Sequence, residues 1–219
     1  MKKRREFLKA SMKWITGIGV FMHPLFSVVQ SVYAKMNKII LPKGTDRESL
    51  NSKDPAELDT RNLELTPLED FGTMGTTDHV VDLNVWSLEI KGLVRNPLKL
   101  TYDQIMALPS IERDVLMICP GVFSNYGRWK GISMKALLNP AGIRKEATHI
   151  NFIGPKIHQY EKTAQYPIED VLADTVFLAY GVNGKPLPQK HGFPLRVVAE
   201  GTYGSDWVKY VYGLEVQIA

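Results

Sequence analysis

The sequence predicts an α+β domain in which short strands outnumber a few short helices. Runs with alternating or mostly apolar side chains recur from Trp86 to Val216, and helical capping signals interrupt them at only three places. The chain shows no Gly-rich strand-to-helix fingerprint of a dinucleotide or phosphate fold, which argues against repeated βαβ units. Its 44% apolar and 23% charged residues are typical of a globular protein.

Most of the predicted strands are short. Residues 86–92 alternate apolar and polar side chains, as a strand with one solvated face does. Residues 114–119 are mostly apolar and end at Cys119, which places the cysteine at a strand end. The other predicted strands span residues 149–154, 177–182, 195–199 and 207–216. Asn183-Gly184 is a typical turn between two of them.

Three short helices are predicted between these strands. Residues 101–109 begin at Thr101, a preferred capping residue, and end at a proline. Residues 133–138 have Ser133 as the expected N-cap, and residues 167–173 have Pro167 in the first turn.

The first 34 residues have the features of a signal peptide. A basic start with paired arginines, Lys3-Arg4-Arg5-Glu6-Phe7-Leu8-Lys9, precedes an apolar stretch and a cleavage motif ending at Ala34. The arginine pair resembles the twin-arginine type, used by proteins that fold around a cofactor before export. The alternative is a retained anchor helix, although glycines, His23 and Pro24 interrupt the apolar stretch. We therefore expect a periplasmic or cell-envelope location.

The rest of the chain divides into two predicted parts. Residues 35–70 are polar with turn formers, which predicts an extended arm, and residues 71–219 form the predicted domain. Residues 1–34 carry a net charge of +5, so the other residues carry −1 of the formal +4. This balance, without a basic cluster interleaved with aromatics, argues against nucleic-acid binding.

Cys119 is the single cysteine of the chain, so an internal disulfide is excluded. A lone thiol in an exported protein is exposed to oxidation, which calls for a reason to keep it. The structural alternative is a small buried hydrophobic residue.

Three segments carry the candidate chemistry, and their order matches a known family. They are Cys119-Pro120-Gly121 followed by Gly127–Gly131, the run from Asn183 to Val198 with His191-Gly192-Phe193-Pro194-Leu195-Arg196, and Gly201–Lys209. The second and third resemble the pterin-binding stretch of the sulfite oxidase superfamily, and the first resembles its metal-ligating loop. The Phe71-Gly72-Thr73 loop and Trp86–Gly92 are most similar to the branch of periplasmic protein-methionine-sulfoxide reductases.

The resemblance implies a molybdenum-molybdopterin cofactor, a sulfite-oxidase-type fold of mixed sheets, and a set of site residues. Cys119 would be the metal ligand and catalytic residue, since a thiolate is a soft ligand suited to such a metal. Arg196 and Lys209 would bind the pterin phosphate, and His191 would hydrogen-bond the pterin. Further cofactor contacts are expected from Trp207, Val208, Ser205, Gly72, Thr73 and Gly154. Tyr126, Arg128 and Lys130 would line the substrate entrance or form a solvated loop.

The sequence also departs from sulfite oxidases. The loops matching that family's substrate-binding arginines read Phe71–Gly75 and Cys119–Ser124, and neither holds an arginine. We therefore expect two-electron oxygen-atom transfer with a sulfoxide-type substrate, and sulfite dehydrogenation as an alternative. No haem-attachment motif occurs, so a separate electron-transfer partner, a membrane haem protein or a cytochrome, is expected.

Two other classes of function remain open at this point. A non-catalytic envelope binding module would keep the fold and explain the altered substrate loops. An enzyme with Cys119 as nucleophile would need a base within hydrogen-bond reach, which no adjacent residue provides.

Overall fold

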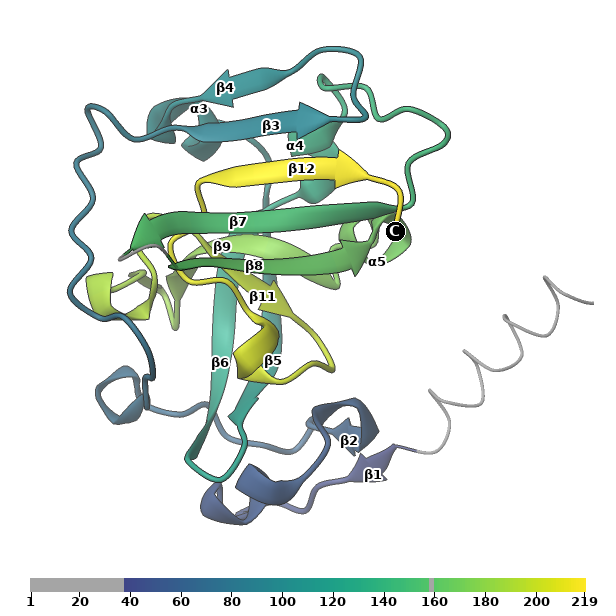
Figure 1. The fold of residues 1–219 in the computed structure, drawn as a ribbon. Helices are drawn as coiled ribbons and strands as arrows, with labels where there is room; N and C mark the ends of the chain where they lie inside the picture. Colours follow the sequence, from purple (N-terminus) through teal and green to yellow (C-terminus); the bar gives the residue numbers. More distant parts are fainter. Residues whose placement is uncertain (1–37, 158–159) are drawn as a thin grey trace, which may run out of the picture. The chain divides into compact units, whose positions relative to one another are not determined.

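A computed structural model describes residues 38–157 and 160–219, so the predicted leader lies outside the described residues. The chain divides into two compact units, Met1–Ile39 and Ile40–Ala219, and the description below concerns the second. It consists of strands with a few short helices, which confirms the predicted α+β class (Figure 1). In the described residues, no helix has the length and apolar character needed to cross a membrane.

One five-stranded sheet carries the cysteine. Its strand order is β10-β9-β6-β5, and β11 also pairs with β9. The strands are β5 (Ser110–Cys119), β6 (Phe123–Ile132), β9 (Val176–Val182), β10 (Lys185–Pro186) and β11 (Arg196–Ala199). Strands β5 and β6 form an antiparallel hairpin in which Cys119 pairs with Phe123 beside the turn. The hairpin thus holds Cys119 at the last position of a long strand.

The second five-stranded sheet has the order β4-β3-β12-β7-β8 (Figure 1). Its strands are β3 (Leu88–Gly92), β4 (Leu98–Leu100), β7 (His149–Ile157), β8 (Tyr160–Pro167) and β12 (Gly213–Gln217). The β12–β3 pair is parallel and the other pairs are antiparallel. Both sheets contribute to one apolar core, with Phe177 of β9, Phe152 of β7 and Leu214 of β12 buried in it.

The three predicted helices are present but shorter than expected. They are α3 (Tyr102–Met106), α4 (Met134–Leu138) and α5 (Ile168–Leu172). Thr101 caps α3 in a reciprocal capping box with Gln104. Ser133 occupies the N-cap position of α4 without a capping hydrogen bond, and Asp174 Oδ1 accepts from the amide of Met134, the first helical residue. Pro167 is the N-cap of α5 rather than a first-turn residue.

Two long strands were missed, as were the short strands of two or three residues, and one strand was predicted too long. β6 was taken in part as a loop, and β8 was not predicted. The predicted strand over residues 207–216 forms β12 only from Gly213, because Tyr210 adopts a positive φ of 66°, which a strand does not accommodate. Residues 207–212 therefore turn, and Lys209 keeps only an isolated bridge to Arg196.

Residues 40–70 pack against the β5–β6 hairpin. The segment begins at the second residue of strand β1 (Ile39–Ile40) and contains the 3-10 helices Glu48–Ser52, Pro55–Glu57 and Leu68–Asp70 and the two-residue strand β2 (Leu58–Asp59). A small apolar cluster joins it to the hairpin and contains Leu41, Leu50, Leu58, Leu116, Ile118 and Tyr126. The segment's assignment as a separate arm stays a prediction.

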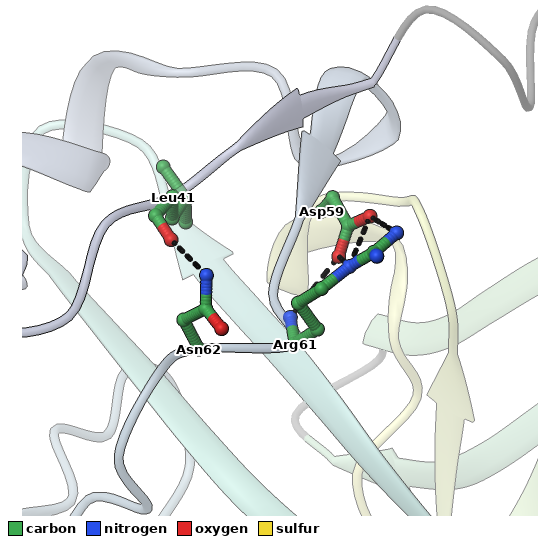
Figure 2. Close-up of polar contacts among 4 residues, drawn as sticks. All are labelled: Leu41, Asp59, Arg61 and Asn62. Atoms are coloured by element: carbon green, nitrogen blue, oxygen red, sulfur yellow. Dashed lines mark hydrogen bonds and ion pairs between the residues drawn. The ribbon is translucent and has the colours of Figure 1, made fainter.

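Local polar contacts hold this segment together. Figure 2 shows that Asn62 Nδ2 donates to the Leu41 carbonyl at 3.1 Å and that the Arg61 guanidinium pairs with the Asp59 carboxylate. At the hairpin, Ser124 Oγ donates to the Arg47 carbonyl at 2.6 Å and the Gly121 amide donates to the Asn51 carbonyl at 2.9 Å. The segment therefore fixes the turn that follows Cys119.

Candidate functional site

A cavity of about 320 Å³ opens beside the end of β5. Its lining comes from the loop of residues 72–76, the β5–β6 turn region, Arg196 of β11 and residues 204–210, together with Pro155, Ile157, Tyr160 and Lys162 of β7 and β8. Its size is at the lower end of ordinary cofactor and small-molecule sites. Segments far apart in the sequence therefore meet at one place.

Cys119 lines this cavity from the last position of β5. The residue is 9% exposed, and its Sγ lies 3.7 Å from Met74 Sδ. Burial raises the pKa of the Cys119 thiol. The free chain thus holds a protonated thiol, which a metal ion would convert to the thiolate.

Arg196 supplies a buried positive charge to the same cavity. Its guanidinium lies 5.1 Å from the ring centre of Trp129 and 5.4 Å from that of Trp207, so two indoles flank it. Nη1 donates to the His191 carbonyl at 2.9 Å. Burial lowers the pKa of Arg196 to about 10. Among the described residues, no carboxylate forms an ion pair with it.

Lys209 brings a second cation to the lining. Its ammonium donates to the Met74 carbonyl at 3.0 Å, to the Lys190 carbonyl at 3.1 Å and to Thr73 Oγ1 at 3.2 Å. Burial first, and the nearby charge of Arg196 second, lower the pKa of Lys209 to about 8. Within residues 38–157 and 160–219 it has no carboxylate partner either. Both cations are thus suited to bind an anionic group of a ligand.

The buried side chain of Asn125 holds the loop of residues 72–76 at its start. The Gly72 amide donates to Asn125 Oδ1 at 3.0 Å, and Asn125 Nδ2 donates to the Gly72 carbonyl at 2.9 Å. A Cβ on Gly72 would lie 2.3 Å from the Phe123 ring, so glycine is required for this close approach. At the other end, Tyr210 Oη donates to the Thr76 carbonyl at 3.3 Å.

His191 is buried next to the cavity but is not part of its lining. Its Nε2 has no hydrogen-bond partner, which is a costly state for a buried ring nitrogen. Burial and the charges of Arg196, Lys190 and Lys209 lower the pKa of His191 to about 4. The imidazole is therefore neutral near pH 7 and can accept or donate one hydrogen bond.

Gly192 allows the two cations to lie side by side. Its φ is 112°, and a Cβ there would lie 2.8 Å from Lys209 Cγ and 3.0 Å from Arg196 Cβ. The close approach of Lys209 and Arg196 therefore explains why a glycine follows His191, which the sequence pattern did not show.

The structure brings most of the predicted site residues to the cavity. The predicted residues in its lining are Gly72, Thr73, Cys119, Arg196, Ser205, Trp207 and Lys209. His191, Val208 and Gly154 lie outside the lining. The Trp207 amide already donates to the Gly204 carbonyl at 3.2 Å, and the Val208 carbonyl accepts from the Val197 amide at 2.8 Å. The roles of these residues toward a cofactor stay predictions.

Three suggested entrance residues lie elsewhere. Tyr126, Arg128 and Lys130 belong to strand β6 and are absent from the lining. Tyr126 packs in the small apolar cluster, and Arg128 pairs with Asp114 across the hairpin at 2.7 Å.

Sequence reasoning missed several residues of the site, and four of them matter for its geometry. Met74, Met117 and Tyr210 line the cavity, and Asn125 anchors its loop. Asn125 lies inside strand β6, and the mixed polar and glycine pattern of that strand gave no signal for it. Met74 lies in the Phe71–Gly75 loop, where sulfite oxidases have an arginine and this chain has none. That difference was the signal that could have identified Met74.

The residues present fit a cofactor that brings its own metal donors. In the described part of the chain, no three His, Cys, Asp or Glu side chains gather as a metal site. A metal at Cys119 would then need its other ligands from the cofactor itself. A single soft sulfur, two cations without carboxylate partners and the orphaned His191 Nε2 match a metal-carrying pterin with a phosphate.

Comparison with known proteins gives the family. The family model described as the oxidoreductase molybdopterin binding domain matches residues 74–219. The uncharacterized oxidoreductase YuiH of Bacillus subtilis (strain 168) is 32% identical over 143 residues, which cover 64% of this chain and 70% of that protein.

Two further relatives are much longer than the matched region. The protein-methionine-sulfoxide reductase catalytic subunit MsrP of Gluconobacter oxydans (strain 621H) is 32% identical over 178 residues, 68% of this chain and 57% of that protein. Nitrate reductase [NADH] 1 of Nicotiana tabacum is 28% identical over 155 residues, 58% of this chain and 17% of that protein. The match thus spans little over half of the sulfoxide reductase subunit and less than a fifth of the nitrate reductase.

A solved structure supports the fold. The sulfane dehydrogenase SoxCD from Paracoccus pantotrophus superposes with a TM-score of 0.60 at 24% identity, covering 70% of this chain and 46% of that chain. At this identity the likeness concerns the fold, which is the predicted sulfite-oxidase-type arrangement of mixed sheets. With a family model matching residues 74–219, the chain belongs to the oxidoreductase molybdopterin binding domain family, within the sulfite oxidase superfamily of molybdopterin-dependent oxidoreductases.

Proposed function

We propose that the chain is an exported oxidoreductase that binds one molybdenum-molybdopterin and catalyses two-electron oxygen-atom transfer on a sulfoxide-type substrate. The observation that carries the proposal is the cavity in which the Cys119 thiol, Arg196 and Lys209 meet. A thiol beside the buried Arg196 and the half-buried Lys209, neither with a carboxylate partner, is unfavourable unless a ligand brings a metal and an anion to them.

Each residue would have a distinct task. Cys119 would hold the metal through its thiolate, and the end of β5 would fix the direction of that bond. Arg196 and Lys209 would bind the pterin phosphate, the first as a flat fork held between two indoles and the second as a point charge.

His191 would contribute its unpartnered Nε2 to the pterin side of the cofactor after a small rearrangement. Bound there, the cofactor supplies the oxygen-atom and electron chemistry, while the protein binds and orients the substrate.

The proposed net reaction is reduction of a sulfoxide to a thioether. The S=O bond breaks, the sulfur gains two electrons, and the oxygen leaves as water with two protons. Electrons would come from a separate haem or cytochrome partner. A relative named as a protein-methionine-sulfoxide reductase supports this direction.

The lining near Cys119 supports it as well. Met74, Met117 and Phe123, which line the cavity together with Cys119, are neutral, and the proposal assigns the lining's cations Arg196 and Lys209 to the pterin phosphate rather than to the substrate. Sulfite oxidation is therefore the weaker alternative, and a non-catalytic binding module does not agree with membership of an oxidoreductase family.

The test is a turnover assay on protein purified from a host that makes the cofactor. A reduced viologen dye would supply electrons, with a methyl sulfoxide or with nitrate as acceptor, and sulfite oxidation would be followed separately with an oxidised dye. We expect turnover with the sulfoxide, none in Cys119→Ala, and full turnover in Arg128→Met, whose side chain lies outside the cavity. Turnover with sulfite alone, or sulfoxide turnover that survives Cys119→Ala, would refute the proposal.

A further inference from the structure

Met74 is the cavity residue that contacts the Cys119 sulfur. Met74 Sδ lies 3.7 Å from Cys119 Sγ, which is contact distance for two sulfur atoms. Met74 is 54% exposed and Cys119 is 9% exposed. The Met74 side chain therefore reaches from the solvent side of the cavity to the buried sulfur.

The backbone around Met74 is held in place while its side chain is free to adjust. The Met74 carbonyl accepts from Lys209 Nζ at 3.0 Å, and its loop is tied to Asn125 at Gly72 and to Tyr210 at Thr76. These contacts fix where the side chain starts. Methionine has three rotatable side-chain bonds, so the thioether can move aside without moving the loop.

The chemistry of this side chain favours one class of substrate. A thioether is uncharged, polarisable and a weak hydrogen-bond acceptor, so it gives a small oxyanion nothing to bind. It packs well against another sulfur compound or an apolar group. Phe123 and Met117 extend the same neutral surface along the lining.

The cations of the lining already have contacts within the chain. Lys209 Nζ donates to three oxygens, one of them the Met74 carbonyl, and Lys162 Nζ donates to the Ser205 carbonyl at 2.6 Å. Arg196 lies between Trp129 and Trp207, and its Nη2 donates to Met117 Sδ at 3.3 Å. The side chain of Met74 contacts Cys119 Sγ directly, so a charge introduced at position 74 would lie beside that sulfur.

We infer that Met74 is a specificity-determining residue: its side chain moves aside for a neutral sulfoxide or thioether, packs against it, and excludes oxyanions from Cys119. This inference rests on the proposed function for its substrate. The control of access to Cys119 by residue 74 does not rest on the proposed function, and it can be measured in the cofactor-free chain.

The first experiment alkylates Cys119 in the full, cofactor-free chain with iodoacetamide, which is neutral, and iodoacetate, which is anionic. Both reagents attack the same thiolate, so the ratio of their rates is independent of the thiol pKa. We expect Met74→Ala to raise both rates, and Met74→Arg to raise the iodoacetate-to-iodoacetamide ratio about tenfold through the added charge. Met74→Leu, neutral and of similar size, should keep the wild-type ratio. Met106→Leu, an exposed methionine on α3, controls for loss of a methionine.

The second experiment measures kcat and KM of the holoenzyme with a methyl sulfoxide and with nitrate. Met74→Arg should raise KM for the sulfoxide and lower it for the anion, while Met74→Leu keeps the preference for the sulfoxide. A holoenzyme whose substrate preference and alkylation ratio are both unchanged in Met74→Arg overturns the inference.

The two experiments separate the inference from the proposed function. If purified protein carries no metal, the proposed function fails and the alkylation ratio alone decides whether residue 74 controls access. If the ratio changes but the holoenzyme preference does not, residue 74 gates the thiol and is not the specificity determinant, which also overturns the inference.

Discussion

Replacing Arg196 by methionine separates the cofactor role of this residue from its role in the fold. Burial lowers the pKa of Arg196 from its usual 12.5 to about 10, which corresponds to roughly 3 kcal/mol spent on keeping the side chain charged. Three contacts oppose this cost. The two flanking indoles return about 1 kcal/mol each, and the hydrogen bond to the His191 carbonyl returns about 2 kcal/mol.

These contributions nearly cancel, so the cofactor-free protein should tolerate the change. We expect Arg196→Met to alter its free energy of unfolding by no more than about 2 kcal/mol, because a neutral side chain of similar length replaces a buried, unpaired charge. Loss of the charge-assisted contact to the cofactor's phosphate should weaken retention of the pterin by at least about tenfold.

Two measurements check this prediction. Urea denaturation of the cofactor-free chain gives the free energy of unfolding, and pterin content after gel filtration gives retention. Arg128→Met, on the exposed face of the hairpin, is the matched control and should retain the pterin. A loss of more than about 4 kcal/mol with unchanged pterin content would show that Arg196 serves the fold and would refute the reasoning.

Three further predictions follow from the geometry around the cavity. Gly192→Ala should lower the free energy of unfolding by about 1–3 kcal/mol in urea denaturation, because its φ is 112° and the new Cβ would press on Lys209 and Arg196; an unchanged midpoint would contradict the geometry. The lowered pKa of Lys209 means that the unfolded chain binds more protons between about pH 8 and pH 10.5, so stability of the cofactor-free protein should rise over that range, and Lys209→Met should remove the rise. Pterin retention should show the opposite trend and fall above about pH 8, where Lys209 loses its charge. In Lys209→Arg, which keeps the charge, retention should not fall. Asn125→Ala would leave the partly buried Gly72 amide and carbonyl without their partner, and hydrogen exchange at Gly72 should become at least about tenfold faster, whereas equal protection would refute the anchoring role.

The sequence was informative where local patterns decide structure. The capping residue Thr101 and the alternation of residues 86–92 are local signals, and both elements formed close to their predicted bounds. Strand β6 was missed because Gly127, Gly131 and several polar residues interrupt its apolar pattern. Those glycines are explained only by the tertiary structure, since a Cβ on Gly131 would lie 2.3 Å from the Leu178 carbonyl of β9.

The candidate site was predictable only in part, for the same reason. Cys119, Arg196 and Lys209 were identified from a single cysteine and a familiar spacing, and the cavity brings them together. Met74 and Asn125 are positioned by contacts across long stretches of chain, to Cys119 and to Gly72, which no local pattern encodes. Lys209 was predicted as a strand residue, whereas the positive φ of Tyr210 turns the chain there.

The content of molybdenum and pterin per chain tests the central claim most directly. Protein purified from a host that makes the cofactor should contain close to one molybdenum and one pterin per chain. In Cys119→Ala the molybdenum should be lost and the pterin held weakly. A well-folded wild-type protein without molybdenum, or a Cys119→Ala protein with the full content, would contradict the assignment of Cys119 as the metal ligand.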